Sequence, residues 1–433
     1  MSASVFSRRS LLRTAGIGAA GIAGSGLLSA CAPSGGSEPS SGGDTGAKDF
    51  GFTAWSLSEP AGKPAVERIL KAWESAHGSK INPLSVPYNN FLQELSLKLN
   101  GRQVSGAVQL DIAWLAAVAQ TGTLANLEPF VQQGGYTSVG LSSGQYEGRQ
   151  YGLPWTTGSI GVIGNQSLMD RAGIKKAPGT ITEFEDALRA LKELKGITPY
   201  AASTAIAQLG DIFPWMQTFG CPIVKDGKVV IGDEASVEAV TWYKRLYDDK
   251  LIAKDVDRNS ARALFGRGTV GFYDDAVVGK AATLANAKDP KGLAAAMVPL
   301  SRPVLRSGDT PQALLWGHVI IVAKGEAQEA ASRFALHTTS DLVTTTRYFK
   351  DVGLPPATSK GLASPDITAD TFTSDWTRRV TLTATPGPFW AYAKNAQIIS
   401  AVAQQVQAVL VGRSSPREAM RTAGEQAAQL LKD

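Results

Sequence analysis

The amino-acid sequence predicts an α/β protein built as two lobes. The chain has 433 residues, whereas single hydrophobic cores stop growing at roughly 250–300 residues, so we expect two cores. Hydrophobic residues make up 43% and charged residues 19% of the chain, with a mean hydropathy of -0.05. This composition excludes a disordered polyampholyte and a multi-span membrane protein. Strand-like and helical segments alternate along the whole length, which predicts lobes with largely parallel sheets.

Residues 1–30 have the three parts of an export signal. Arg8, Arg9 and Arg13 form a basic start, an uncharged stretch follows, and small residues precede Cys31. The paired arginines and the glycine-diluted apolar stretch resemble a twin-arginine signal peptide. The alternative is a transmembrane anchor, but the uncharged stretch is short and weakly apolar for a span, which needs about 20 residues.

Residues 28–31 read Leu-Ser-Ala-Cys and resemble the bacterial lipobox, which predicts cleavage before Cys31 and a lipid (palmitate) on its thiol. Residues 31–48 are rich in Ser, Gly and Pro without apolar periodicity, which is typical of a flexible tether. The folded body would then lie at the outer face of the cytoplasmic membrane. Cys221 is the only other cysteine, and we expect it to be a small buried hydrophobe rather than a disulfide partner.

The folded body begins with two strand–helix units. A strand is expected at residues 50–55 and another at residues 81–86, each followed by a helix that ends at a glycine, Gly78 or Gly101. The apolar faces of the two helices are Val66, Ile69, Leu70 and Trp73, and then Phe91, Leu92, Leu95 and Leu99.

Later elements are indicated by a strand pattern and two capping boxes. Residues 110–115 read as a strand. Thr182 and Glu185 have the spacing of an N-cap and its N3 partner, which predicts a helix that begins after Thr182. Ser415 and Glu418 repeat this spacing, with Pro416 at the first position of the last helix.

The formal net charge of +5 does not indicate a nucleic-acid-binding protein. Arg8, Arg9 and Arg13 belong to the predicted leader, and without them 40 basic residues face 38 acidic residues. No run of basic residues interleaved with aromatic residues occurs elsewhere in the sequence. We therefore expect no nucleic-acid partner.

Two motif matches lack the context that their chemistry needs. Gly16, Gly18 and Gly21 match the dinucleotide-binding pattern, but they lie in the leader and follow no strand. Residues 140–144 match the nucleophile elbow around Ser142, yet they read as a loop, and the elbow requires a preceding strand. A cell-surface serine hydrolase that uses Ser142 stays open as the alternative class. No metal or cofactor is expected, because no H-x-x-x-H, cysteine pair, calcium loop or P-loop occurs.

Seven short segments follow one another along the body of the chain: residues 120–127, 146–154, 163–165, 172–174, 182–184, 263–272 and 387–392. In this order they resemble segments of the family 1 extracellular solute-binding proteins of ABC importers, the maltose-binding-protein-like group, and residues 146–154 resemble the family's Y-x-G-K-x-Y-G-x-P hairpin. The resemblance covers the chain from residue 50 to the C-terminus. After residues 111–114 the sequence reads Leu115-Ala116-Ala117-Val118, where many sugar binders have an acidic residue and a longer insert. One carboxylate that binds sugar hydroxyls is therefore expected to be absent.

This resemblance implies the type II periplasmic-binding-protein fold, with two α/β lobes joined by crossing hinge segments and a ligand cleft between them. The crossings are expected near residues 159–165, 297–302 and 338–345. Lobe 1 would comprise residues 49–160 and 300–340, and lobe 2 residues 161–299 and 341–433.

A sugar site needs flat aromatic platforms, because a pyranose shows C–H patches on its faces, and hydrogen-bonding groups for the hydroxyls at its rim. Tryptophans at predicted strand ends or beside turns are the platform candidates, with polar residues next to them. The predicted ligand-binding residues are Trp55, Ser56, Tyr88, Asn89, Trp114, Trp155, Thr156, Asp211, Trp215, Tyr273, Asp274, Trp316 and Trp390. Packing in the core is the alternative for each tryptophan, and it is the expected role of Trp73 and Trp242, which lie on helical faces.

The resemblance and the residues together predict the substrate-binding lipoprotein of an ABC importer, a monomer without catalytic activity. It would capture a di- or oligosaccharide by lobe closure and deliver it to permease subunits in the membrane. Within the binding class, a glycerophosphodiester or a polyamine remains the alternative ligand, although a polyamine needs several carboxylates converging in the cleft.

Overall fold

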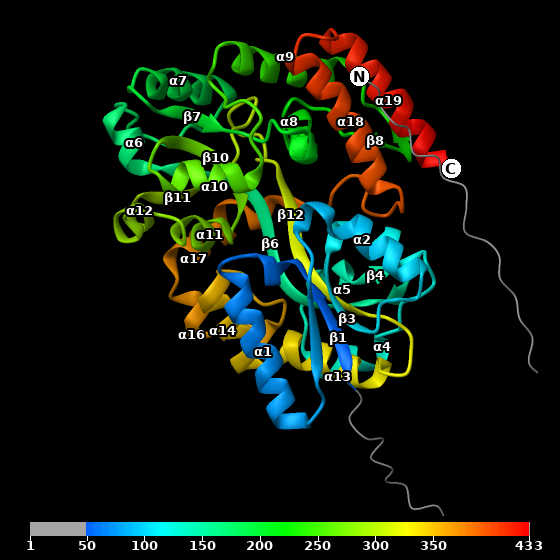
Figure 1. Cartoon of the computed structure of the whole chain (residues 1–433). Coiled ribbons are helices and arrows are strands. Elements are labelled where there is room, and N and C mark those ends of the chain that lie inside the picture. Colours follow the sequence, from blue (N-terminus) through cyan, green and yellow to red (C-terminus); the bar gives the residue numbers. More distant parts are fainter. Residues whose placement is uncertain (1–48, 433) are drawn as a thin grey trace, which may run out of the picture. The chain divides into compact units, whose positions relative to one another are not determined.

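The computed structural model describes residues 49–432, in which most strands belong to one nine-stranded sheet (Figure 1). The strand order is β2-β1-β3-β12-β6-β10-β7, with β11 paired to β6 and β13 paired to β12. The strands are β1 (Phe50–Ala54), β2 (Ile81–Ser85), β3 (Gly106–Asp111), β6 (Gly152–Asn165), β7 (Thr198–Ala201), β10 (Val270–Ala276), β11 (Met297–Leu300), β12 (Ala313–Val322) and β13 (Ala384–Thr385). The predicted leader, Cys31 and the tether lie outside the described residues.

Strand β6 joins the two halves of this sheet. Its first part pairs antiparallel with β12, from Gly152 opposite Ile321 to Ile160 opposite Leu314. Its last part pairs antiparallel with β10 and β11. Only Thr157 of this strand is not fully buried, as expected for a strand covered on both faces. The first predicted crossing, near residues 159–165, falls on β6.

The prediction of largely parallel sheets is wrong, because the sheet is mixed. Parallel pairing joins β1 to β2 and β3, and β10 to β7, as crossover connections through helices require. The pairs β3–β12, β12–β6, β6–β10 and β6–β11 are antiparallel. The long strands β6 and β12 therefore run against the strands of the strand–helix units, a direction that local sequence patterns do not encode.

The half of the sheet with β1, β2 and β3 is covered by helices that come from two separate parts of the sequence. They are α1 (Gly62–His77), α2 (Tyr88–Asn100), α3 (Leu115–Ala119), α4 (Glu128–Gly134), α5 (Ser138–Ser143) and α13 (Gln328–Ser340). Helix α13 packs on β3, β6 and β12, and its buried Phe334 contacts the rings of Phe50 and Phe52 at centroid distances of 5.5 and 5.4 Å. The predicted end of α1 is confirmed, since Gly78 adopts the left-handed conformation with φ of 69°.

The half with β7, β10 and β11 has its own core. Its helices are α6 (Gln166–Arg171), α7 (Ile181–Lys192), α8 (Ile212–Thr218), α9 (Glu234–Asp248), α10 (Arg258–Gly266), α11 (Gly279–Leu284), α12 (Pro290–Ala296), α18 (Asn395–Leu410) and α19 (Pro416–Lys432). Helices α18 and α19 pack against each other and against α9 (Figure 1). Cys221 and Trp242 are buried in this core, as predicted, and Trp73 is buried in the core beside α1.

Residues 341–380 lie against elements of both halves. They form α14 (Leu342–Val352), α15 (Ser359–Leu362), α16 (Pro365–Thr368) and α17 (Thr371–Arg379). Helix α14 packs against α1, α13 and α11, whereas α17 packs against β11. The predicted crossing near residues 338–345 corresponds to the junction of α13 and α14.

One predicted helix start and one predicted strand need correction. Thr180, not Thr182, caps α7: its hydroxyl accepts from the Glu183 N–H, and the Glu183 carboxylate accepts from the Thr180 N–H. This register buries Ile181 at the start of the helix. Helix α2 begins at Tyr88 behind Pro87, so Asn89 lies within its first turn.

The strand predicted at residues 110–115 instead ends at Asp111. The carboxylate of Asp111 accepts a hydrogen bond of 2.9 Å from the Ala113 N–H, which turns residues 112–114 into a 3-10 helix. The hairpin predicted within residues 146–154 is confirmed: β4 (Gln145–Tyr146) pairs with β5 (Arg149–Gln150). The Ser415 cap is confirmed too, because its hydroxyl accepts from the Glu418 N–H.

The short hairpin β8 (Val224–Lys225) and β9 (Lys228–Val229) completes the strands of the described residues. No helix among residues 49–432 combines the length and the apolar character needed to cross a membrane.

Candidate functional site

Two adjoining cavities lie between the halves of the sheet. Their volumes are about 430 and 340 Å³. Five residues line both cavities: Tyr88, Asn89, Gln208, Arg258 and Trp316. One wall comes from the ends of β1 and β3, the start of α2 and the strand β12, and the facing wall from α10 and the 3-10 helix Ile206–Asp211. Because the two cavities share these residues, we treat them as one site.

The carboxyl ends of neighbouring parallel strands bring the first wall together. Trp55 directly follows β1, Tyr88 follows β2, and Asp111 ends β3. Since β1 pairs parallel with both β2 and β3, these three residues emerge at the same edge of the sheet. The location agrees with the predicted positions of Trp55, Tyr88 and Asn89.

Aromatic rings form a box in this wall. Trp55 meets Tyr88, Trp114 and His318 edge to face at centroid distances of 5.5, 5.9 and 4.8 Å. Trp316 meets His318 in the same way at 4.6 Å. Trp316 and His318 are two residues apart on β12 and therefore share a face of the strand. These T-shaped contacts hold each ring in a defined orientation.

Asp111 fixes two of these rings through one carboxylate oxygen. Its Oδ2 accepts from the Tyr88 hydroxyl at 2.8 Å and from Trp316 Nε1 at 2.9 Å. Burial raises the pKa of Asp111 above its ordinary value, and its three hydrogen bonds oppose that rise. Asp111 was not among the predicted site residues, although its place at the end of a buried strand is a signal for it.

His318 is a neutral ring with a defined tautomer. Gln109 Oε1 accepts from the Ser56 N–H, so its Nε2 is the amide nitrogen and donates to His318 Nδ1 at 3.0 Å. The proton of the imidazole is therefore on Nε2, which has no hydrogen-bond partner among the described residues. Burial lowers the pKa of His318 to about 3. The ring lines the larger cavity as an uncharged donor.

The facing wall is polar but internally neutralised. Arg258 donates to Asp211 at 2.6 Å, and Arg262 makes a two-pronged contact with Asp275 at 2.7 and 2.8 Å. Glu59 lies near Arg262 and Asp275, and burial raises its pKa above the ordinary value, with Arg262 opposing this rise. Each arginine thus has a carboxylate partner within the protein, so the wall presents hydrogen-bonding edges rather than a net charge.

The smaller cavity ends at Trp390 and α18. Trp390 is half-buried and lines this cavity together with Trp114 and Asn395. Asn395 Nδ2 donates to the Ala113 carbonyl at 2.7 Å, which ties the start of α18 to the segment after β3. The Oδ1 atom of Asn395 is buried without a partner among the described residues.

Seven predicted ligand-binding residues line the two cavities, and six do not. The seven are Trp55, Tyr88, Asn89, Trp114, Asp211, Trp316 and Trp390. The six, all buried, are Ser56, Trp155, Thr156, Trp215, Tyr273 and Asp274. These six side chains lie behind the lining of the two cavities, and their partners explain why.

The six residues support the site from beneath or belong to a core. Trp155 stacks on Tyr348 at 4.3 Å. Ser56 Oγ accepts from Gln109, the Thr156 hydroxyl from the His318 N–H, and the Tyr273 hydroxyl is bonded to Thr283.

Asp274 and Trp215 share one buried cation. Arg302 donates to Asp274 at 3.0 Å, and its guanidinium lies 4.4 Å from the centre of the Trp215 ring. The Tyr200 hydroxyl also donates to Asp274. A buried arginine needs such partners, so these two residues are occupied within the protein.

Several cavity-lining residues escaped sequence reasoning. They are Gln208, Arg258, Arg262, Asp275, His318 and Asn395. The spacing of Arg258 and Arg262, one turn apart behind the N-cap Asp257, is the one signal that places two of them on a common helix face.

Ser142 does not have the surroundings of a nucleophile. It lies in the short helix α5, and its hydroxyl donates to the Val139 carbonyl at 2.8 Å. No strand leads into it as the elbow requires. Among residues 49–432, no group of three or more His, Cys, Asp or Glu side chains has the arrangement of a metal site.

Comparison with known proteins adds the family. The family model for bacterial extracellular solute-binding proteins matches residues 68–373. A binding protein of Brucella abortus is 26% identical over 236 residues, which span 52% of this chain and only 57% of that protein. The diacetylchitobiose binding protein DasA of Streptomyces coelicolor is 24% identical over 345 residues, 75% of this chain and 78% of that protein.

Solved structures show the same fold. The GacH receptor of Streptomyces glaucescens, studied unliganded and with acarbose, has a TM-score of 0.80 at 21% identity, over 89% of this chain and 99% of that one. Maltose-bound MalE3 of T. maritima has a TM-score of 0.80 at 18% identity, over 89% and 100% of the two chains. The fold is thus the predicted two-lobed α/β fold of periplasmic binding proteins. The matched model belongs to proteins that bind solutes rather than transform them, so the hydrolase alternative is set aside, and the chain belongs to the bacterial extracellular solute-binding protein family.

Proposed function

We propose that this protein captures a di- or oligosaccharide outside the cytoplasmic membrane by closure of its lobes and delivers it to the permease of an ABC importer. The observation that carries the proposal is the aromatic box, in which Asp111 holds Tyr88 and Trp316 beside Trp55 and Trp114. Flat rings in fixed orientations suit the C–H faces of pyranose rings.

The charge of the cavity walls supports a neutral, hydroxyl-rich ligand. Arg258 and Arg262 are neutralised by Asp211 and Asp275, while His318 is uncharged. A glycerophosphodiester would call for cations without internal partners, and a polyamine for several free carboxylates. Glu59 alone does not supply the latter, so a sugar is favoured over both alternatives.

The relatives give independent support. DasA is named for diacetylchitobiose, GacH was studied with acarbose, and MalE3 was determined with maltose. These are all oligosaccharides or close analogues of them. We extend this ligand class, but no particular sugar, to the present chain.

The attachment to the membrane forms a second part of the proposal. Export by a twin-arginine leader, acylation of Cys31 and a tether over residues 31–48 would keep a monomeric binding body next to its permease. Cys31→Ala is expected to abolish membrane retention, because the thiol that carries the lipid is lost. Fractionation of cells that express each variant measures this, with Cys221→Ala as the matched control that stays in the membrane fraction. Equal retention of Cys31→Ala and the parent protein would contradict the lipid anchor.

A thermal-shift screen against mono- and oligosaccharides tests the ligand class. A ligand present at 100 times its Kd stabilises the folded state by about 2.7 kcal/mol, an easily detected shift. We expect at least one oligosaccharide to raise the midpoint of unfolding, whereas spermidine and glycerophosphocholine leave it unchanged. A shift by either of the latter alone would contradict the proposal.

A further inference from the structure

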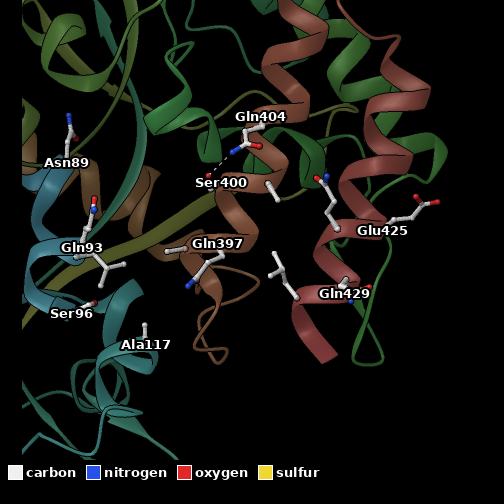
Figure 2. Close-up of a pocket in the computed structure, with 14 residues that line it drawn as sticks. Asn89, Gln93, Ser96, Ala117, Gln397, Ser400, Gln404, Glu425 and Gln429 are labelled. Atoms are coloured by element: carbon white, nitrogen blue, oxygen red, sulfur yellow. Dashed lines mark hydrogen bonds between the residues drawn. The ribbon is translucent and has the colours of Figure 1, made fainter. Parts of the chain in front are cut away.

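A third hollow, here called the mouth groove, opens beside the smaller cavity and has a volume of about 1000 Å³ (Figure 2). It is lined by α2 on one side and by α18 and α19 on the other, with Ala117 of α3 at its edge. Asn89, Leu92, Ala396 and Ser400 line both the groove and the smaller cavity. The groove is therefore continuous with the aromatic site.

Each of the three helices turns one face toward the groove. On α2 and α18 the lining residues follow the i, i+3, i+4, i+7 spacing of a single helix face: Asn89, Leu92, Gln93 and Ser96, and then Gln397, Ser400, Ala401 and Gln404. On α19 they are Glu425, Gln426, Gln429 and Leu430. Figure 2 shows side chains from these helices on both sides of the hollow. The groove is therefore lined by one face of each helix, and the side chains on these faces determine its polarity.

The chemistry of these faces is unusual for a helical surface, since six amides and two hydroxyls accompany a single ionisable side chain. That side chain, Glu425, is paired with Arg421 at 2.7 Å. The side chains of Asn89, Gln93, Gln397 and Gln429 make no hydrogen bond to another described residue. Each free amide offers two donors and an acceptor. The groove thus presents many unused hydrogen-bonding groups and almost no charge.

We propose that the mouth groove binds the outer units of an oligosaccharide whose inner units occupy the aromatic cavities. The inference rests on the proposed function and specifies its ligand as a chain longer than a disaccharide. Neutral amides suit hydroxyl groups, which also donate and accept. The groove has no aromatic lining residue, so the outer units would be held by their hydroxyl edges and the inner units by their ring faces.

The test is a calorimetric titration with glucose, N-acetylglucosamine, mannose and xylose oligomers of two to five units. Three proteins without the leader but otherwise complete are compared: the parent, the double variant Gln404→Ala with Gln429→Ala, and Gln407→Ala. Gln404 and Gln429 are exposed, so the double variant keeps its core. Gln407 lies on the same helix as Gln404 but does not line the groove, which makes it the matched control.

We expect the parent and Gln407→Ala to bind tetramers of the preferred series about fivefold or more tightly than dimers, since one net hydrogen bond of about 1 kcal/mol corresponds to that factor. The double variant should lose this gain and keep the affinity for the dimer. Affinity that does not depend on chain length in the parent, or a gain that the double variant retains, would overturn the groove site while leaving sugar binding intact. Failure of every oligomer to bind the parent would overturn the proposed function and the groove site together.

Discussion

Asp111 shows at the scale of single residues how much of the site depends on one buried acceptor. Its Oδ2 atom holds both the Tyr88 hydroxyl and the Trp316 indole, while Oδ1 caps the 3-10 helix that carries Trp114. Among residues 49–432, neither the Tyr88 hydroxyl nor the Trp316 indole N–H has another side-chain hydrogen-bond partner. The orientation of three aromatic walls is therefore coupled to this carboxylate.

Asp111→Asn should weaken sugar binding about tenfold, because the amide that replaces Oδ2 cannot accept from Tyr88 and Trp316, whereas the remaining oxygen can still cap Ala113. The Trp316 N–H would lose its acceptor and the Tyr88 hydroxyl would have to turn to accept from the new amide, so the free energy of unfolding should also fall by about 1–3 kcal/mol. Calorimetric titration and urea unfolding measure the two effects. Asp341→Asn is the control, since Asp341 caps α14 away from both cavities and Asn caps a helix as well as Asp does. Unchanged affinity in Asp111→Asn would show that the carboxylate does not position the rings.

The buried ring of His318 gives the protein a defined dependence of stability on pH. Its pKa is about 3 in the folded protein, lowered from 6.5 by burial. Between pH 6.5 and 3 the unfolded chain binds a proton at this residue and the folded protein does not, so stability falls as the pH drops through this window. The expected loss from His318 alone is about 2 kcal/mol at pH 5.

Replacing the ring tests this pH dependence. Urea unfolding at pH 7 and pH 5 should show a smaller loss in His318→Gln than in the parent, with a difference of about 2 kcal/mol between the two proteins. His77→Gln serves as the control. An identical loss in the parent and His318→Gln would mean that the ring already binds a proton in the folded state.

At the scale of elements, the start of α7 shows where sequence reasoning succeeds and where it fails. Thr180 and Thr182 both stand three residues before a glutamate, so two capping boxes compete in the sequence. The structure uses Thr180 with Glu183, and Glu185 instead accepts from Trp242 Nε1 at 2.8 Å. A tertiary contact thus decides between two registers that local spacing leaves equal.

Thr180→Ala should lower the free energy of unfolding by about 1 kcal/mol, the usual effect of removing an N-cap hydroxyl. Thr182→Ala should change it by less than about 0.5 kcal/mol, because this side chain is exposed and caps nothing. Denaturant unfolding of the two variants distinguishes the registers. The opposite ranking would support the box that begins at Thr182.

The difference between local patterns and tertiary contacts also explains how much of the site could be predicted from the sequence. Helices α1 and α2, the β4–β5 hairpin and the last helix follow from local periodicity and turn residues, and the positions of Trp55 and Tyr88 follow from strand ends. Trp155 and Trp215 also lie beside turns or strand ends in the sequence, but they face the interior. The face that a residue presents depends on the pairing of β6 with β12 and on the packing of α8, which are long-range features.

At the scale of the whole molecule, function depends on bringing two separately built walls together. The aromatic wall comes from β1, β3, α2 and β12, and the polar wall from α10 and residues 206–211. Strand β6 runs continuously through both halves of the sheet, so it is a shared hinge element in our account. The hydrogen bond from Asn395 to the Ala113 carbonyl closes the smaller cavity from the side of α18.

The central claim is that a sugar binds between these walls against the aromatic rings that line the two cavities, and it is tested most directly by comparing Trp390→Ala with Trp155→Ala. Each variant is unfolded in urea and titrated calorimetrically with the sugar that gives the largest thermal shift. Trp390 is half-buried and lines the smaller cavity, so its removal should weaken binding about tenfold and change stability little. Trp155 is buried against Tyr348, so its removal should lower the free energy of unfolding by about 3–5 kcal/mol, with affinity close to that of the parent in the fraction that remains folded. If Trp390→Ala binds the sugar as tightly as the parent does, the ring is structural and the proposed site is wrong.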